Sequence, residues 1–470
     1  MFEIFKSPVF RQYAVVVMVN LSTIGFGMGI AWGSPVLVKL TNETQTVLPE
    51  PLTDEEGSWI ISVGSLTALL AFSVVFFVDV IGRKYTLLLF ACFPKIILCL
   101  LYIFANKFWL LLMGRALSGM VDSIVLIIVP MYASEVASVE IRGSLGTILQ
   151  IFSSIGILIM LSFGPFLSYL SLNVMYTCIT IAATIPILFL PQSPYFLYSR
   201  GRTAESTKVL TFLRGSEELA IEELKDYSTT TDDQGDTVNK LKLFKDRIFL
   251  KALGIVFVIA AGNNFIGYNA VTFYLQTVLQ STGTSISPEV SSVVIGCIQL
   301  TASICTALIT DRFGRKPILS VTLIGMAFGM VGLGIFFKLK ENSDDITGFL
   351  NVVPLASFII IVFAFSAGPG SLSWILVAEL FDGPARGVGA TINIFIATAT
   401  VFITTKYFPA LIAAIGPALT YWIFSINCVL LSLFILYFVP ETKGKSFKEI
   451  QIALGARYVN DMNANLQQKQ

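Results

Sequence analysis

The chain has 470 residues, of which 55% are hydrophobic and only 13% are charged, and its formal net charge at pH 7 is +1. Soluble domains carry about 25% charged residues, so this composition excludes an ordinary soluble protein and indicates one that lies in a lipid bilayer. The near-neutral charge gives no electrostatic footprint for binding nucleic acid.

Metal, cofactor and enzyme chemistry are also disfavoured by the residues present. The chain has no histidine, and its six cysteines lack the spacing of metal ligands. No nucleophile, base and orienting group form a recognisable catalytic motif. We therefore expect a protein that is not an enzyme and that needs no metal or cofactor.

Apolar stretches long enough to cross about 30 Å of hydrocarbon occur twelve times along the chain. Their centres lie near Gly25, Leu69, Leu98, Met120, Gly156, Ala182, Ile259, Leu300, Met326, Phe363, Ala397 and Leu430. Backbone groups in lipid must be satisfied internally, and the period-two pattern of a barrel is absent. The sequence therefore predicts an all-α, polytopic membrane protein with twelve transmembrane helices.

A polar stretch, roughly Gln192 to Asp246, divides these spans six and six. We expect four parts: a six-helix bundle over 1–190, a cytoplasmic helical linker over 191–249, a second six-helix bundle over 250–440 and a cytoplasmic tail over 441–470. Within the linker, helical spacing predicts short amphipathic helices with caps at Thr203 and Ser216 and a break at "STTTDDQGD". A wholly disordered linker is the alternative.

Lys and Arg in the short loops favour one orientation, with both termini in the cytoplasm. The first span lacks a small-residue cleavage site after a short apolar core, so we expect it to be retained. The sequence Asn42-Glu43-Thr44 then falls in the first outer loop and predicts N-glycosylation at Asn42. We expect the protein in the plasma membrane.

Paired charges recur in the loops of the two halves. "VDVIGRKY" after the second span returns as "TDRFGRKP" after the eighth, and an acid seven residues before Arg-Gly follows the fourth and tenth spans. The four pairs are Asp79 with Arg83, Glu135 with Arg142, Asp311 with Arg315, and Glu379 with Arg386. The repetition predicts two pseudo-equivalent halves that each carry the same charged cytoplasmic elements.

Two further charges, Lys95 and Asp122, fall well inside the third and fourth spans. Charges at this depth are costly and mark a function or a specific pairing. Three interpretations are open: a structural Lys95–Asp122 ion pair, a Lys95 that extends to the interface with Asp122 in an aqueous cavity, and an Asp122 that takes up and releases a proton as part of the protein's function.

Eight motifs occur in a fixed order along the chain: the two "DxxGRK"-type turns, "GRALSG", "PMYASEVASVEIRG", "PQSPYFL", "GYNAVTFY", "GPGSLSWILVAELF" and "PETKGKS". Together they make the chain similar to the sugar porter family of the major facilitator superfamily, from about Gln12 to Lys448. The "TTKYF" at Thr404 to Phe408 and the compact tail look most similar to an insect branch of facilitated trehalose transporters. The resemblance implies alternating access between two six-helix bundles around a site near the bilayer midplane.

The same resemblance gives the charged pairs a role as a cytoplasmic gate. An arginine fork facing a carboxylate can form an ion pair in one conformation and lose it in another. The eight residues Asp79, Arg83, Glu135, Arg142, Asp311, Arg315, Glu379 and Arg386 would then close the cytoplasmic side when the protein faces outward.

Polar side chains within the spans predict the substrate. Most are amides, which donate and accept hydrogen bonds without charge and so suit the hydroxyls of a neutral sugar, and one tryptophan could face a sugar ring. The predicted substrate-binding residues are Gln150, Asn263, Asn264, Asn269, Gln299 and Trp374. A helix-packing role for any single amide is the alternative.

Departures from the family pattern leave the exact sugar open. Asn263-Asn264 replaces a glutamine pair, and Ala397-Thr398 stands where the family usually has Asn-Trp. Proton-coupled relatives carry an aspartate in the first span, where this chain has Gly27. We therefore expect a facilitative uniporter of trehalose or a hexose, whose partners are the sugar and the bilayer. A proton-coupled symporter and a non-transporting sugar sensor are the alternatives, and nothing in the sequence indicates an oligomeric partner.

Overall fold

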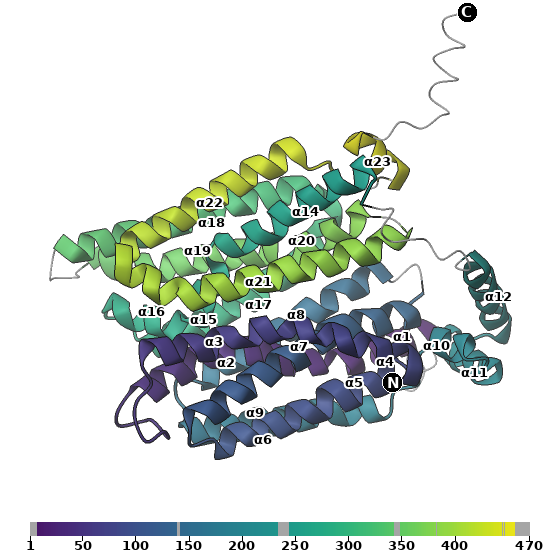
Figure 1. Cartoon of the computed structure of the whole chain (residues 1–470), viewed down its shortest axis with the longest axis horizontal. Coiled ribbons are helices and arrows are strands. Elements are labelled where there is room, and N and C mark those ends of the chain that lie inside the picture. Colours follow the sequence, from purple (N-terminus) through teal and green to yellow (C-terminus); the bar gives the residue numbers. More distant parts are fainter. Residues whose placement is uncertain are drawn as a thin grey trace, which may run out of the picture. The chain divides into compact units, whose positions relative to one another are not determined.

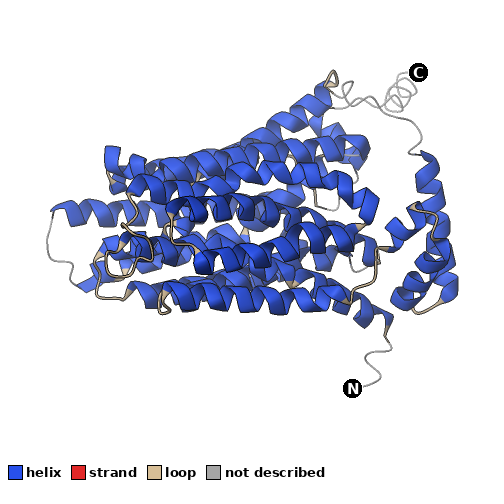
Figure 2. Ribbon diagram, turned by 60° about the horizontal axis from the view of Figure 1, so that its bottom comes forward, coloured by secondary structure: helices blue, strands red, loops and turns tan. Residues whose placement is uncertain are grey.

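The computed structural model describes residues 7–138, 142–233, 244–342, 348–381, 383–443, 445 and 447–455. Within these residues the regular secondary structure is helical throughout (Figure 2). Eleven helical stretches among them are long and apolar enough to cross a membrane, and Ile148–Phe163 is a shorter apolar helix. All twelve predicted centres fall in these helices, so the predicted fold class is confirmed.

Contacts group the chain into two compact units. Unit 1 comprises Met1–Thr237, Asn269–Ser303 and Val401–Ala414, and unit 2 comprises Val238–Tyr268, Ile304–Thr400 and Ile415–Gln470. The four-part division expected from the sequence stays a prediction.

Unit 1 holds the first six spans and the linker helices. Its helices are α1 (Pro8–Asn20), α2 (Ser22–Thr41), α3 (Asp54–Thr67), η2 (Ala68–Val74), α4 (Val75–Ile81), α5 (Arg83–Leu87), η3 (Leu88–Cys92), α6 (Phe93–Phe104), α7 (Phe108–Val136), α8 (Arg142–Phe163), α9 (Tyr169–Leu188), α10 (Pro194–Ser199), α11 (Thr203–Arg214), α12 (Glu217–Asp233) and α16 (Leu275–Thr282). Three further helices cross the division: α15 (Tyr268–Phe273), α17 (Pro288–Phe313) and α21 (Gly383–Ile415).

Local sequence explains how several of these helices begin. Thr53 and Glu56 form a reciprocal capping box at the start of α3, and Ser193 caps α10 ahead of Pro194. Within unit 1, α2 packs along α8, α3 packs along α7, and α6 packs along α9. Helices α6 and α9 lie side by side in Figure 1. These helix pairs hold the charged side chains described below.

The linker helices agree in part with the sequence. The Ser216 hydroxyl accepts from the Glu218 N–H at 3.2 Å, which confirms the predicted cap. The Thr203 cap is wrong, because Arg202 occupies the cap position and its carbonyl accepts from the Ser206 N–H at 3.1 Å. The predicted break begins too early, since α12 continues to Asp233; the rest of that stretch, 234–236, lies outside the described residues.

Tyr227 holds the middle of α12 against α10. Its ring packs edge-on against Tyr195 of α10 with ring centroids 5.4 Å apart, and its hydroxyl donates to Glu223 of α12 at 2.9 Å.

Unit 2 holds most of the remaining spans. Its own helices are α14 (Arg247–Phe265), α18 (Arg315–Asn342), η4 (Gly348–Asn351), α19 (Val353–Ala367), α20 (Pro369–Leu380), α22 (Pro417–Phe438) and α23 (Phe447–Leu454). Within it, α18 packs against both α19 and α22. The spans are interrupted at glycines, notably Gly267 between α14 and α15 and Gly368 between α19 and α20.

Candidate functional site

The repeated charged turn has the same backbone geometry in both copies. Gly82, between α4 and α5, has φ +89°, and Gly314, between α17 and α18, has φ +87°. Residues with a side chain rarely adopt this left-handed region. The two glycines therefore explain why the motif keeps Gly-Arg-Lys at the same place in each copy.

In unit 1, Arg83 joins two of the predicted acids. Its Nε lies 3.0 Å from the Glu135 Oε1 and its Nη1 lies 3.2 Å from the Asp79 Oδ1. The Arg83 side chain is only 7% exposed, and its guanidinium lies 5.9 Å and 5.7 Å from the rings of Tyr195 and Phe196. The arginine is thus enclosed by α10 on one side and the acids on the other, whereas Asp79 is 80% exposed.

Unit 2 repeats one of these ion pairs. The Arg315 Nη2 lies 3.2 Å from the Glu379 Oε1, at the positions that correspond to Arg83 and Glu135. Three other predicted gate residues, Arg142, Asp311 and Arg386, have side chains outside the described part of the structure. The pairing of arginine and glutamate is therefore seen in both copies, and the gating role stays a prediction.

Sequence reasoning missed a second repeated element beside these turns. The Gln192 side chain donates through Nε2 to the Ile81 carbonyl at 3.1 Å and accepts from the Lys84 N–H at 3.4 Å. In unit 2, Glu441 accepts from the N–H groups of Arg315 and Lys316, each at 3.1 Å. Each side chain caps the helix that follows the glycine turn.

The Glu441 cap is a carboxylate, and backbone N–H groups around it stabilise its charged form. Burial raises the pKa of this carboxyl, but the N–H groups of Lys443, Arg315, Lys316 and Thr442 outweigh it and leave the pKa below its ordinary value. The motifs "PQSPYFL" and "PETKGKS" each follow the last span of a half, and this shared position was the signal that could have revealed the caps.

The linker helices are fixed to the end of unit 1 where α1 begins and α7 ends. Arg214 of α11 donates to the Val136 carbonyl at 2.8 Å and forms a two-point ion pair with Glu223 of α12, at 2.7 and 2.9 Å. Gln12 of α1 donates to the Leu213 carbonyl at 3.0 Å and accepts from the Ser138 N–H at 2.9 Å. The end of α7 is therefore tied to both α1 and α11.

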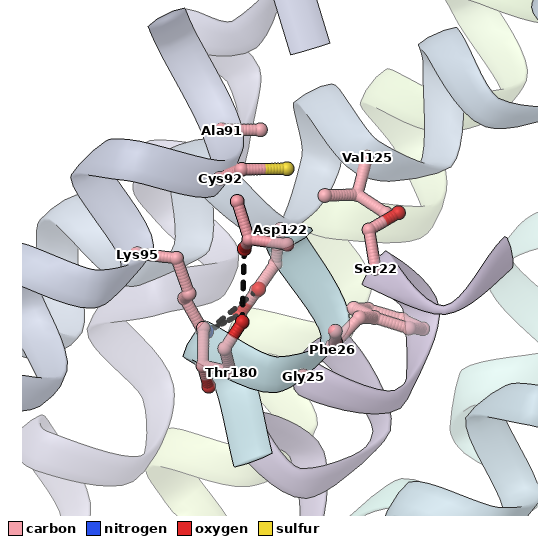
Figure 3. A pocket seen from close by; sticks show the side chains of 11 residues that line it. Ser22, Gly25, Phe26, Ala91, Cys92, Lys95, Asp122, Val125 and Thr180 are labelled. Carbon is pink, nitrogen blue, oxygen red and sulfur yellow. Dashed lines mark hydrogen bonds and ion pairs between the residues drawn. The ribbon is translucent and has the colours of Figure 1, made fainter. Parts of the chain in front are cut away.

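The two intramembrane charges form an ion pair. The Lys95 Nζ lies 2.7 Å and 2.9 Å from the two carboxylate oxygens of Asp122 and 3.2 Å from the Ser118 hydroxyl. Their side chains are 6% and 14% exposed. Figure 3 shows both pointing toward each other beside a small cavity that Ser22, Cys92 and Thr180 also line. The first of the three interpretations is confirmed as a contact, and Lys95 does not extend to the interface.

Arg115, four residues before Gly119, is another buried cation, and sequence reasoning missed it. Its guanidinium donates to the carbonyls of Gly29 at 3.1 Å and Ile60 at 3.3 Å and lies 5.2 Å from the Trp32 ring. It therefore links α7 to both α2 and α3. An arginine inside the apolar stretch "GRALSG" was the available signal.

Two predicted sugar-binding amides of unit 1 lie near one contact. The Ser154 and Ser303 hydroxyls lie 2.8 Å apart and join α8 to α17. Gln150 and Gln299 each precede one of these serines by four residues, so each lies one turn, about 6 Å, from the contact on the same helix face. Gln299 is 4% exposed, and its amide makes no hydrogen bond within the described residues. Asn269 of α15 is half-buried.

The predicted residues of unit 2 differ in their surroundings. Asn263 is half-buried, and its amide has no hydrogen bond within the described part of the chain. Asn264 is 4% exposed and donates to α21, at the Thr400 hydroxyl 2.9 Å away. Trp374 of α20 is 51% exposed, so its indole is open to a ligand or to lipid. Binding of sugar by these six residues stays a prediction.

Gly27 lies where α2 meets α8 with no intervening side chain. A Cβ added at Gly27 would lie 2.0 Å from the Ser153 carbonyl oxygen, closer than any real contact. The obstacle is backbone, which cannot move aside as a side chain could. No side chain, and so no carboxylate, fits at this position without separating the two helices.

Comparison with known proteins places this geometry in a family. Residues 15–454 match the family model described as "Sugar (and other) transporter". The facilitated trehalose transporter Tret1 of Polypedilum vanderplanki is 32% identical over 94% of this chain and 88% of its own length. A Tret1-2 homolog from Drosophila sechellia is 31% identical over 94% of this chain and 90% of its own length.

Solved structures show the same fold. The proton:xylose symporter XylE bound to 6-bromo-6-deoxy-D-glucose matches with a TM-score of 0.73 and 22% identity, over 95% of this chain and all of that chain. An inward-open form of XylE from E. coli matches with a TM-score of 0.75 and 21% identity, over 94% and 99% of the two chains. At these identities the likeness concerns the fold alone.

Proposed function

Because the chain belongs to the sugar transporter family, we propose that it is a facilitative carrier that lets a neutral sugar cross the membrane by alternating access. A multi-pass membrane protein of this family is not an enzyme, and its substrate class is sugar. The proposal adds two points: the sugar moves down its own gradient, and trehalose is the first candidate.

The contact of Gly27 with Ser153 carries the first point. A symporter needs a group that takes up and releases a proton as the protein changes conformation. The site that holds an aspartate in proton-coupled relatives has no room for a side chain here. Asp122, a carboxylate inside the fourth span, is already paired with the Lys95 ammonium at 2.7 Å, so a proton on Asp122 would break a buried ion pair.

The curated relatives support trehalose as substrate. The transporters that are 31–32% identical over 94% of this chain are named for facilitated trehalose transport. The predicted site is also uncharged: it offers amides from Gln150, Asn263, Asn264, Asn269 and Gln299 and an indole from Trp374. Such groups exchange hydrogen bonds with hydroxyls and stack on a sugar ring without attracting ions.

The arginine–glutamate pairs provide the conformational bias. Arg83 with Glu135 and Arg315 with Glu379 join helices that belong to one unit each. We assign these pairs, together with Asp79, Arg142, Asp311 and Arg386, to the cytoplasmic gate. Breaking them is expected to shift the carrier toward its inward-open form.

Orientation and location follow from the same proposal. The Lys and Arg of the short loops put both termini in the cytoplasm of a plasma-membrane protein. Asn42, in the exposed loop after α2, would then face outward, and its side-chain oxygen accepts from the Thr44 hydroxyl at 2.8 Å. Glycosidase treatment should lower the apparent mass of wild type but not that of Asn42→Gln, which would support this orientation. The same mass change in both proteins would contradict it.

Competitive uptake tests the function. The chain is expressed in a host without sugar carriers, and labelled trehalose uptake is measured with excess unlabelled trehalose, glucose or fructose. We expect saturable uptake that trehalose inhibits most strongly, with Gln299→Ala as a site variant and Lys208→Ala, at an exposed position, as a control. Uptake equal to that of empty cells, for all three labelled sugars, would contradict the proposal.

A further inference from the structure

The last turn of α14 lies at an interruption of the span. The helix ends at Phe265, Gly267 adopts φ +86°, and α15 begins at Tyr268. An interruption in the membrane leaves carbonyl groups without helical partners. Side chains of α22 satisfy them: the Asn427 Nδ2 donates to the Phe265 carbonyl at 3.1 Å, and the Cys428 Sγ lies 4.0 Å from the Ile266 carbonyl.

Aromatic side chains pack against the next two residues, Gly267 and Tyr268. A Cβ at Gly267 would lie 2.3 Å from the Phe424 ring, and Tyr268 stacks on Phe365 of α19 with centroids 3.4 Å apart. The interruption is therefore enclosed by α19 and α22. Helix α21 is a further neighbour within unit 2.

Asn264 makes the connection to α21. Its Nδ2 donates to the Ala260 carbonyl in its own helix at 2.9 Å, to the Thr400 hydroxyl at 2.9 Å and to the Ala397 carbonyl at 3.2 Å. Because two of these acceptors are carbonyls, only the NH₂ end of the amide can face them. An amide has two N–H groups, so its donors are fully committed to the protein.

The hydroxyl of Thr400 is likewise occupied by hydrogen bonds within the protein. Its hydroxyl donates to the Ile396 carbonyl at 2.7 Å while accepting from Asn264. Ala397 accepts from Asn264 through its backbone carbonyl. The link between α14 and α21 therefore depends on the amide of Asn264 and on the hydroxyl of Thr400.

Asn263 faces differently from Asn264. Successive residues of a helix lie about 100° apart, so the two side chains leave α14 on different faces. Asn263 is half-buried and its amide makes no hydrogen bond to any residue that the structure describes. One asparagine of the pair is thus bound to the protein, and the other is available.

We propose that Asn264 is a positioning residue: its amide fixes α21 against the end of α14 and so places Asn263, which is the member of the pair that hydrogen-bonds the sugar. The sugar contact rests on the proposed function, whereas the link between the helices does not. The inference reverses what the resemblance implies, since both positions of the pair would otherwise bind sugar.

Uptake kinetics of matched variants test the assignment. Thr400→Val keeps the shape of the side chain and removes the hydroxyl, Thr400→Ser keeps the hydroxyl, and Asn263→Leu and Asn264→Leu remove each amide. Initial rates of trehalose uptake, divided by the amount of protein at the surface, give KM and Vmax for each variant. Thr400→Ser reports whether any effect of Thr400→Val comes from the lost hydrogen bond.

We expect Asn263→Leu to raise KM about tenfold, the loss of one to two neutral hydrogen bonds. Thr400→Val should raise KM in the same direction, Thr400→Ser should stay within about twofold of wild type, and Asn264→Leu with Thr400→Val should be no worse than Asn264→Leu alone. In the Thr400→Val background, Asn263→Leu should raise KM less than it does in wild type. A wild-type KM in Thr400→Val together with a raised KM in Asn264→Leu would overturn the proposal, because Asn264 would then contact the sugar itself.

A second measurement separates this inference from the proposed function. If wild type transports none of the three sugars, the proposed function is wrong. The hydrogen-bonded link between α14 and α21 can still be measured by thermal unfolding of the purified variants. Non-additive losses of Tm for Asn264→Leu and Thr400→Val support the link between α14 and α21. Additive losses would overturn it.

Discussion

At the scale of single residues, Gly27 and the Lys95–Asp122 pair support the proposed uniport. Gly27 has no room for a carboxylate, and Asp122 already has a cation as partner. The pair also adjoins α2, since a Cβ at Gly29 would lie 3.1 Å from both the Asp122 Oδ2 and the Lys95 Nζ. Three helices therefore meet at one buried, balanced pair of charges.

The pair predicts an asymmetry between single and double substitutions. Lys95→Met or Asp122→Leu alone leaves an uncompensated buried charge and should lower the free energy of unfolding by about 3–5 kcal/mol. The double variant removes both charges and should recover most of the loss. Thermal unfolding of the purified variants measures this, with Ser22→Ala as a control that lines the same cavity.

Recovery of trehalose uptake in the double variant would show that the pair has a structural role. A double variant that unfolds like wild type but transports nothing would contradict that role and give Asp122 a part in transport itself.

At the scale of elements, each half pairs a left-handed glycine turn with a side chain from the end of its last span. Gln192 serves this purpose beside Gly82, and Glu441 serves it beside Gly314. Only the second cap is charged, and a carboxylate at a helix N-terminus also interacts favourably with the helix dipole. The two halves therefore carry the same kind of helix cap, and the cap of the second half is the stronger one.

The charged cap predicts a defined pH dependence. Glu441→Gln should lower the free energy of unfolding by about 1–2 kcal/mol at pH 7, because an amide NH₂ cannot accept the hydrogen bonds of a helix end. The folded-state pKa of Glu441 lies below its ordinary value, so the cap contributes fully above the unfolded-state pKa of about 4.3 and is lost as pH falls through the lower, folded-state pKa.

Thermal unfolding of wild type and Glu441→Gln, compared from pH 3 to 8, measures this effect. The difference in Tm between wild type and Glu441→Gln should be constant from pH 5 to 8 and should shrink below about pH 4. Gln192→Ala, at the neutral cap, should show a difference that does not change with pH. A wild-type advantage that grows on acidification would contradict the assignment.

Sequence patterns predicted the spans well because membrane crossing depends on length and hydropathy, both of which are local properties. The repeated acids and arginines were predictable because they recur at constant spacing, but the arginine–glutamate pairs that the structure shows, Arg83–Glu135 and Arg315–Glu379, are not the pairs that the spacing indicated. The caps by Gln192 and Glu441, the contacts of Arg115 and the commitment of Asn264 to α21 were not predictable, because each joins residues far apart in sequence. The Thr203 cap was wrong because the neighbouring turn extends α11 by one residue.

At the scale of the whole molecule, the proposed carrier has the gradient of its sugar as its only driving force. The amides proposed to bind the sugar are uncharged, and the carboxylates of Glu135, Asp122, Glu379 and Glu441 each have a cation or helix N–H groups as partners. Such a carrier should be indifferent to the proton gradient.

Sugar flux in proteoliposomes tests this claim most directly. Purified protein is reconstituted, and labelled trehalose is followed with and without an inward proton gradient and with unlabelled trehalose preloaded inside. We predict the same final level of label with and without the proton gradient, and a transient overshoot when the vesicles are preloaded. Accumulation above the outside concentration that requires the proton gradient, without preloaded sugar, would contradict the account.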